Sequence, residues 1–394
     1  MKRTVILIAG VFALAFAVSL KAQIRVVKNA RGFDGDATVE YRGVTGDAAL
    51  SASVSKFLQA CGWFKLISGK ADYTVSGQVS GGRVNLAVTS TIGPGFNISQ
   101  SVAGSDRETA KRVVDAVLKA IFKIDGICRT RIAFSGESSP GVKNIYLCDI
   151  DGGDFKRLTS FHSLCVESSW SPGGSSVVYT KYGRAVTSVI ETRLSPLSSR
   201  RLVGYPGLNA GAKISPNGKY LALILSKDGQ VELYVKSLEG RARRRLTNSS
   251  TPESTPCWSP GGGQLCYVSG SSGRPQLYII GANGGRNMHL RTEGSEATSP
   301  SWSSNNQIAY SCRMGNDYAI AVYDIKTGQN EVLTKTAGSW ESPSWAPDAR
   351  HIVCSRTYGG RTSLYIIDSM TGEARKLIGG GSSLTMPSWS PILQ

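Results

Sequence analysis

Three histidines, eight cysteines and a recurring set of glutamates are the residues of this sequence that could carry chemistry. His162, His289 and His351 lie far apart and none stands in an HExxH motif, so they indicate no metal site. The sequence has no G-x-S-x-G nucleophile elbow, no P-loop and no dinucleotide-binding G-x-G-x-x-G motif after a predicted strand. These patterns predict a protein that is not an enzyme and that uses no metal and no cofactor.

The cysteines indicate buried thiols and one candidate disulfide. Cys257 and Cys266 flank a predicted tight turn and could face each other across a hairpin, and an exported chain permits a disulfide there. No CxxC spacing occurs, which disfavours both a zinc site and thioredoxin-like chemistry. Most of the others lie in apolar runs, where a buried free thiol is the ordinary interpretation. These others are Cys61, Cys128, Cys148, Cys165, Cys312 and Cys354.

The glutamates are the strongest candidates for a binding site. Glu167, Glu253, Glu296 and Glu341 each occur just before a predicted strand that begins a repeat. In the architecture predicted below, these loops share one face and surround the mouth of a channel. Acids there would attract a complementary partner or a cation, and solvated loop charge is the alternative interpretation.

A repeated motif predicts the architecture that holds these loops. Its spacing is 44 residues throughout, except for one interval of 43, and the motif ends a predicted strand with a turn. Such a period in strand-rich sequence is typical of β-propeller blades. The copies are Trp170-Ser-Pro-Gly, Ile214-Ser-Pro-Asn, Trp258-Ser-Pro-Gly, Trp302-Ser-Ser-Asn, Trp345-Ala-Pro-Asp and Trp389-Ser-Pro-Ile.

Each repeat supplies four strands, and the two ends of the repeat region predict how the ring closes. The tryptophan can wedge between blades, while proline and the following glycine or asparagine suit the turn after it. The region opens at Arg131 with a second strand and ends at Trp389 with a first strand. The C-terminal strand must therefore complete the opening blade, which gives six blades over residues 128–394.

A different pattern over residues 23–127 predicts a small α/β domain. A short strand is expected at 24–27, and Asp47 can cap a helix that Gly62 ends. Alternating apolar residues on both sides of Gly81-Gly82 predict a β-hairpin. A capping box at Ser105 predicts a second helix with an apolar stripe.

The first 22 residues resemble a secretory signal peptide. Lys2 and Arg3 precede an apolar stretch that is shorter than the roughly 20 residues of a membrane-spanning helix. Cleavage is expected after Ser19 or Ala22, and an uncleaved anchor is the alternative. The protein is therefore expected to be exported and not membrane-spanning.

The chain is strongly basic, with a formal net charge of +17. The densest basic run, Arg241-Ala-Arg-Arg-Arg245, has no interleaved aromatic residues of the kind that a nucleic-acid surface uses. This run is predicted to be a solvated hairpin turn, and no nucleic-acid partner is expected. The charge instead favours residence near anionic lipid or peptidoglycan.

Beyond the repeats, several stretches resemble the TolB family of the bacterial Tol–Pal system. They are Ala60-Cys-Gly-Trp-Phe64, Ala71-Asp-Tyr-Thr-Val-Ser-Gly77, Ser226-Lys-Asp-Gly229, Arg274-Pro-Gln-Leu-Tyr278, Glu341-Ser-Pro-Ser-Trp-Ala-Pro347 and Pro387-Ser-Trp-Ser-Pro391. The resemblance implies a monomeric periplasmic protein that binds other proteins, with an α/β domain before a six-bladed propeller. It also implies a role in envelope integrity and cell division.

The resemblance implies two partners. The first is a Pal-like peptidoglycan-associated lipoprotein on the channel-mouth face, at Leu208, Asn209 and Gly211 together with the acids named above. Leu208 stands where the family commonly has histidine. The second is a TolA-like inner-membrane protein, bound by the first residues of the mature chain, which are Gln23, Ile24, Arg25, Val26 and Val27. A secreted propeller that binds glycan or peptidoglycan directly is the alternative function.

Overall fold

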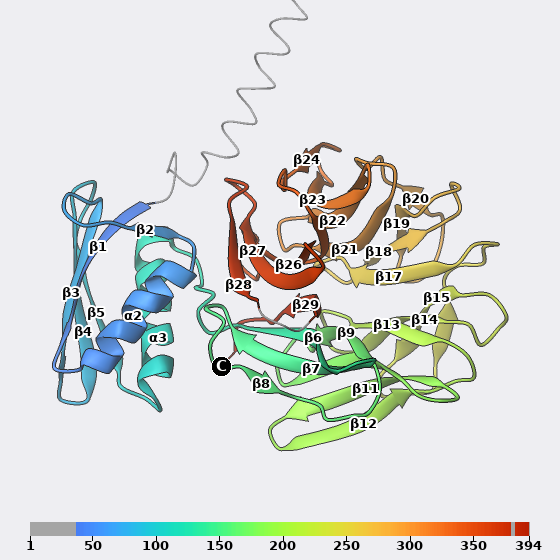
Figure 1. Cartoon of the computed structure of the whole chain (residues 1–394), viewed down its shortest axis with the longest axis horizontal. Coiled ribbons are helices and arrows are strands. Elements are labelled where there is room, and N and C mark those ends of the chain that lie inside the picture. Colours follow the sequence, from blue (N-terminus) through green and yellow to red (C-terminus); the bar gives the residue numbers. More distant parts are fainter. Residues whose placement is uncertain (1–36, 380–382, 394) are drawn as a thin grey trace, which may run out of the picture.

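The computed structural model describes residues 37–379 and 383–393. The expected leader, the strand expected at 24–27 and the TolA-like epitope lie outside the described residues. The described chain forms a small α/β domain and a larger ring of β-sheets (Figure 1). Within these residues, no helix combines the length and the apolarity that crossing a membrane would require.

The small domain is a five-stranded sheet with order β2-β1-β3-β4-β5, and two helices pack on it. The strands are β1 (Ala37–Thr45), β2 (Phe64–Leu66), β3 (Tyr73–Ser80), β4 (Arg83–Ser90) and β5 (Phe96–Ser101). The helices are α2 (Ala48–Ala60) and α3 (Asp106–Phe122). Their buried apolar side chains and one face of the sheet form a single core.

Local signals explain where both helices begin and where the first one ends. The Asp47 carboxylate accepts a hydrogen bond from Leu50 N at 2.9 Å, and the Ser105 hydroxyl accepts one from Glu108 N at 3.3 Å. Gly62 has φ +69° just after α2, a conformation that glycine adopts without strain. The predicted caps and the hairpin β3–β4 are confirmed, whereas β1, β2 and β5 were not predicted.

The rest of the described chain forms six four-stranded sheets, here called blades 1 to 6. Blade 1 has the order β29-β6-β7-β8, and its strands are β29 (Leu384–Trp389), β6 (Arg131–Ser139), β7 (Val142–Asp149) and β8 (Lys156–Arg157). Blade 2 contains β9 (Cys165–Trp170), β10 (Ser176–Tyr182), β11 (Thr187–Leu194) and β12 (Leu197–Val203). Blade 3 contains β13 (Asn209–Ile214), β14 (Tyr220–Leu225), β15 (Glu232–Ser237) and β16 (Arg243–Arg245).

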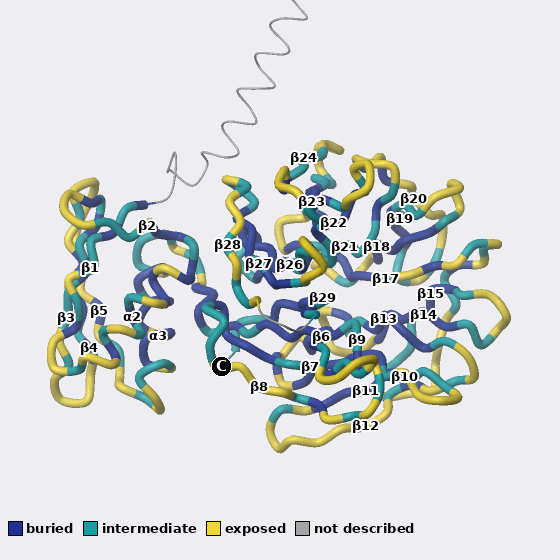
Figure 2. Tube along the Cα trace, in the orientation of Figure 1, coloured by how far each residue is buried: buried dark blue, intermediate teal, exposed yellow. Residues whose placement is uncertain are grey.

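Blades 4 to 6 repeat this plan. Blade 4 contains β17 (Glu253–Trp258), β18 (Gln264–Ser269), β19 (Gln276–Gly281) and β20 (Met288–His289). Blade 5 contains β21 (Ala297–Trp302), β22 (Gln307–Met314), β23 (Asp317–Asp324) and β24 (Asn330–Val332). Blade 6 contains β25 (Ser339–Trp345), β26 (His351–Tyr358), β27 (Arg361–Asp368) and β28 (Ala374–Ile378). The middle strands of the blades are largely buried and the connecting loops are exposed (Figure 2).

The predicted ring closure is confirmed. The last strand, β29, pairs antiparallel with β6, with Trp389 opposite Ile132 and Leu384 opposite Gly136. Two of the predicted wedging tryptophans also join neighbouring blades by a hydrogen bond. Trp170 Nε1 donates to Ser388 O of blade 1 at 3.1 Å, and Trp258 Nε1 donates to Lys213 O of blade 3 at 2.8 Å.

The two faces of the ring differ in what covers them. The face where the chain enters the innermost strands is called the mouth face, and the face where it leaves them is called the turn face. The small domain packs on the turn face, where Trp63 Nε1 donates to Asp348 Oδ2 at 3.0 Å. Arg107 and Lys111 of α3 also form ion pairs with Asp149. The mouth face is therefore left uncovered by the small domain.

Candidate functional site: the channel and its mouth face

Every innermost strand is bent at the same point by a β-bulge. The pairing register shifts there in all six blades, and the bulged residue has positive φ. These residues are Glu167 (φ 57°), Gly211 (63°), Thr255 (42°), Ser299 (53°), Ser342 (56°) and Met386 (51°). All six line a narrow cavity of about 90 Å³ at the centre of the ring, which is the channel.

Glu167 uses its carboxylate to join two blades at this bulge ring. Its Oε2 accepts hydrogen bonds from Thr180 Oγ1 at 2.7 Å and from Gly211 N at 2.8 Å. A Cβ on Gly211 would lie 3.3 Å from Pro256 Cδ of blade 4, so the backbone of blade 3 also packs closely against blade 4 at this point. Glu167 and Gly211 were predicted to contact a partner, and the structure places both in the wall of the channel.

Lys213 was missed by the sequence analysis, yet it is the cation among the residues that line the channel. It stands two residues after the bulge, where the other blades carry small side chains: Ser169, Cys257, Ser301, Ser344 and Ser388. Within the described residues its ammonium group has no hydrogen bond or ion pair. Burial lowers the pKa of Lys213, and the charges of Glu167 and Cys257 only partly oppose this.

We expect the substitution Lys213→Met to stabilise the protein at neutral pH. Because the pKa of Lys213 is lowered in the folded state, the protonated amine costs folding free energy at pH 7, and the cost fades as the pH rises towards 10.5. Methionine keeps most of the apolar stem and removes the charge, for a gain of about 1 kcal/mol, or roughly 2–4 °C in melting temperature. Thermal melts from pH 7 to pH 10.5 should show this gain shrinking. The exposed Lys219→Met is the control, and a lowered melting temperature for Lys213→Met would contradict the prediction.

The other three predicted acids differ in their surroundings. Glu253 is buried, with 2% exposure, and Ser249 Oγ donates to its Oε1 at 2.7 Å. Glu296 accepts a hydrogen bond from Tyr318 OH at 2.6 Å and pairs with Arg313. Glu341 is half-buried, and its carboxylate has no partner among the described residues. Burial raises the pKa of both Glu253 and Glu341. Glu253 therefore does not fit the alternative interpretation of a solvated loop charge, and the role of the four acids in binding stays a prediction.

Leu208 and Asn209 lie at the start of β13 on the mouth face. Leu208 is partly buried against the core between blades 3 and 4. Asn209 is fully buried, and its side-chain amide donates to Thr187 O and Tyr205 O at 3.0 and 2.7 Å. Asn209 thus fixes the shape of the loop before β13, so any effect it has on a partner acts through that loop.

Cys257 and Cys266 lie directly opposite each other in β17 and β18, as the predicted hairpin requires. Both are buried and both are free thiols in this structure. Burial raises the pKa of Cys266, and its hydrogen bond with the Cys257 thiol raises it further. The register is compatible with a disulfide, and the pairing itself stays a prediction. The part of the chain that the structure describes contains no cluster of three metal-binding side chains.

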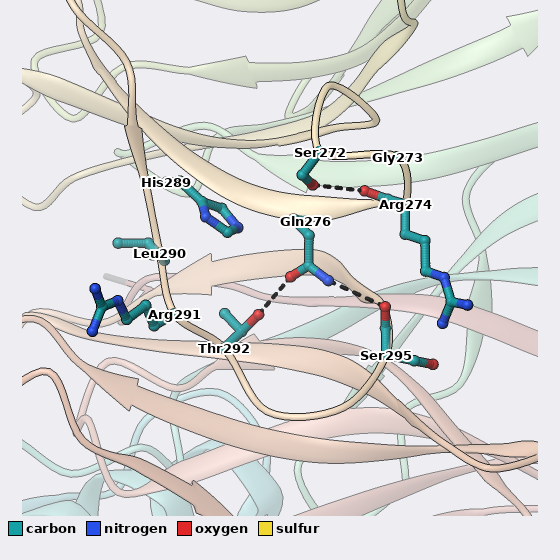
Figure 3. A pocket seen from close by; sticks show the side chains of 9 residues that line it. All are labelled: Ser272, Gly273, Arg274, Gln276, His289, Leu290, Arg291, Thr292 and Ser295. Carbon is teal, nitrogen blue, oxygen red and sulfur yellow. Dashed lines mark hydrogen bonds between the residues drawn. The ribbon is translucent and has the colours of Figure 1, made fainter.

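A second concavity of about 410 Å³ opens at the rim of the mouth face, between blades 4 and 5 (Figure 3). It is called here the rim groove. Gln276 lies at its centre, with Arg274 and Arg291 on its two sides and His289 above. The full set of lining residues is Ser272, Gly273, Arg274, Gln276, His289, Leu290, Arg291, Thr292 and Ser295.

Comparison with known proteins identifies the family. A family model described as the TolB beta propeller domain matches residues 118–393. The chain belongs to this TolB propeller family. Among solved structures, TolB from Acinetobacter baumannii superposes with a TM-score of 0.83 at 24% sequence identity, over 91% of this chain and 97% of that one. A TolB-like propeller combined with a small α/β domain is therefore the fold of this chain, as the resemblance implied.

Curated relatives align over shorter stretches. The Tol-Pal system protein TolB of Anaeromyxobacter dehalogenans strain 2CP-C is 29% identical over 158 residues, which is 40% of this chain and 36% of that protein. The Tol-Pal system protein TolB of Desulfosudis oleivorans is 33% identical over 143 residues, 36% of this chain and 32% of that protein. The aligned segments thus span about a third of the length of these relatives.

Proposed function

We propose that the protein is a periplasmic, non-enzymatic adaptor of a Tol–Pal system, which binds a Pal-like lipoprotein on the mouth face. Membership of the TolB family and the relatives named as Tol-Pal system proteins support this role. On this proposal the adaptor links the inner membrane to the peptidoglycan-associated lipoprotein, and it supports envelope integrity during division.

One observation carries the assignment of the partner to the mouth face. Glu341 holds a half-buried carboxylate beside the channel that no described residue satisfies. A half-buried carboxylate that is unpaired in the free protein is available to accept a hydrogen bond from a donor on a partner. The mouth face is also the face that the small domain leaves open, since the contacts of Trp63 and Arg107 lie on the turn face.

We expect Glu341→Lys to weaken the binding of a Pal-like lipoprotein domain by at least about tenfold. The substitution replaces the carboxylate acceptor with an ammonium donor, which would face the donor of the partner. Glu253 is left unchanged because its burial would mix a folding defect into the result. Isothermal titration of the mature protein measures the effect. Glu239→Lys makes the same charge change in an exposed turn on the turn face and serves as the control. Equal affinities for Glu341→Lys and wild type would place the contact elsewhere.

The proposal assigns the TolA-like partner to residues 23–28, which lie outside the described residues. Their alternation of apolar and basic side chains suits addition of a strand to the edge of a partner's sheet. We expect removal of residues 23–28 to abolish binding of a TolA-like C-terminal domain and to leave melting temperature and Pal-like binding unchanged. Both affinities are measured on the trimmed protein. Survival of TolA-like binding would mean that the described domains carry both contacts.

A further inference from the structure

The rim groove has the chemistry of a small polar binding site that is separate from the channel. It lies between the loop that joins β18 to β19 and the segment that runs from β20 to β21. It is an open surface depression of about 410 Å³, large enough for one small polar molecule to lie against its floor. Neither Glu341 nor any residue of the bulge ring lines it, so the groove is not part of the site proposed for the Pal-like partner.

The floor of the groove is a fixed array of neutral hydrogen-bonding groups. The Gln276 amide is held at both ends, since its Oε1 accepts from Thr292 Oγ1 at 2.8 Å and its Nε2 donates to Ser295 O at 3.2 Å (Figure 3). This leaves one N–H of the amide and one lone pair on its oxygen for a ligand. The Ser272 hydroxyl donates to Arg274 O at 3.3 Å and keeps its own acceptor capacity. This mixture of hydrogen-bond donors and acceptors matches the hydroxyl groups of a sugar, each of which can both donate and accept a hydrogen bond.

One wall of the groove is flat and the two sides are cationic. The His289 imidazole packs against Tyr278 with ring centroids 4.9 Å apart, and it presents a planar face to the groove above Gln276 (Figure 3). Arg274 and Arg291 flank the floor on opposite sides, and both are exposed. Within the described residues neither guanidinium has an acidic partner. The nearby Glu296 is engaged by Tyr318 and Arg313, and Glu293 does not line the groove.

We propose that the rim groove binds an acidic sugar, with the sugar ring over His289 and Gln276 and its carboxylate on a flanking arginine. Guanidinium groups bind carboxylates through paired hydrogen bonds, which gives charge selectivity. The planar wall and the mixed donors and acceptors of the floor suit a sugar ring, whose hydroxyls both donate and accept hydrogen bonds. The formal net charge of +17 also favours an anionic ligand.

The test uses the mature protein and three small probes: N-acetylmuramic acid, N-acetylglucosamine and lactate. The first differs from the second by its lactyl carboxylate, and lactate carries that carboxylate without the sugar. Titration followed by protein NMR should show N-acetylmuramic acid binding at least tenfold more tightly than either of the others. The double variant Arg274→Gln, Arg291→Gln should remove this preference, and Gln276→Ala should weaken both sugars. Arg361→Gln removes an exposed arginine of blade 6 and is the control.

Each alternative outcome overturns a defined part of the proposal. If the two sugars bind equally tightly, the arginines do not recognise the carboxylate. If lactate binds as tightly as N-acetylmuramic acid, the groove does not recognise the sugar ring. An unchanged affinity in the double variant, with an unchanged melting temperature, would move the site away from the rim groove. Because Pal-like binding is measured separately on Glu341→Lys, the failure of one proposal is distinguishable from the failure of the other.

Discussion

Deleting residues 384–394 is expected to unfold the propeller or to lower its melting temperature severely. The deletion removes β29, so β6 loses its inner partner and the ring is left with an open edge between blades 1 and 6. It also removes the buried Trp389, whose Nε1 donates to Thr130 Oγ1 at 2.7 Å, and the buried Leu384. Truncating a buried tryptophan alone costs roughly 3–5 kcal/mol, against a total stability of about 5–15 kcal/mol for a typical domain.

The measurement is a thermal melt of the full and truncated mature proteins, followed by circular dichroism. A peptide spanning residues 383–394, added in excess, should recover part of the lost stability because it can pair with β6 as β29 does. Met288→Ala, a truncation at an exposed position of blade 4, is the control and should change stability little. Equal melting temperatures for the full and truncated proteins would contradict closure by β29.

The propeller was predictable because its signals are local and repeat. Five of the six copies place a tryptophan at the end of an inner strand, every copy has a turn after it, and the unpaired motifs at Arg131 and Trp389 predicted the closure. The strands β1, β2 and β5 of the small domain lack such signals. The strand β1 pairs with strands that are distant in sequence, as where Val39 lies opposite Tyr73 of β3, and no short pattern encodes that pairing.

The ring of bulges was missed although the sequence contains a signal for it. Proline follows the bulged residue in four blades, at Pro256, Pro300, Pro343 and Pro387. Proline inside a central strand cannot donate to the ladder and therefore indicates a bulge. The bulged residues themselves share no side-chain type, since Glu167 and Met386 occupy equivalent positions. What repeats is the backbone conformation.

The candidate site was predictable only as a region. Sequence reasoning placed the glutamates in the loops before the inner strands, whereas the structure places Glu167 and Glu341 inside β9 and β25, and Glu253 is the first residue of β17. Sequence reasoning could not separate the buried Glu253 from the half-buried Glu341, because the two residues stand at different distances from their bulges, at Thr255 and Ser342. A shift of one residue along a strand turns a side chain to the opposite face. Exposure therefore depends on a register that the loop sequence alone does not give.

The contact between the small domain and blade 6 leads to the second large effect, which is expected from Asp348→Ala. The Asp348 carboxylate is buried in the turn between β25 and β26, where Trp63 Nε1 and His351 Nδ1 both bond its Oδ2, at 3.0 and 2.7 Å. Its Oδ1 accepts from the backbone N–H groups of Arg350 and His351. Removing the carboxylate leaves these buried N–H donors without an acceptor, which costs about 3–5 kcal/mol of folding free energy.

The same variant should also loosen the attachment of the small domain, since Trp63 is contributed by that domain. Scanning calorimetry should show a lower melting temperature and a separate, earlier transition for residues before about 127. Asp125→Ala is the control, because Asp125 forms an exposed ion pair with Lys119 and contributes little. A single transition at the wild-type temperature would show that the other interface contacts, such as Arg107 with Asp149, hold the domains without Asp348.

The pH dependence of Asp348→Asn then identifies the charge as the stabilising element. Burial opposes ionisation of Asp348, but the neighbouring His351 and the hydrogen bonds outweigh it and hold the pKa of the carboxyl well below its ordinary value of 3.8. A carboxylate with a lowered folded-state pKa stabilises the fold above its ordinary pKa, and this contribution is lost as the pH falls through the folded-state value. The stability difference between wild type and Asp348→Asn should therefore be level above about pH 5 and shrink below pH 3.8. A difference that stays constant down to pH 2 would mean that the shape of the side chain, and not its charge, joins Trp63 to the propeller.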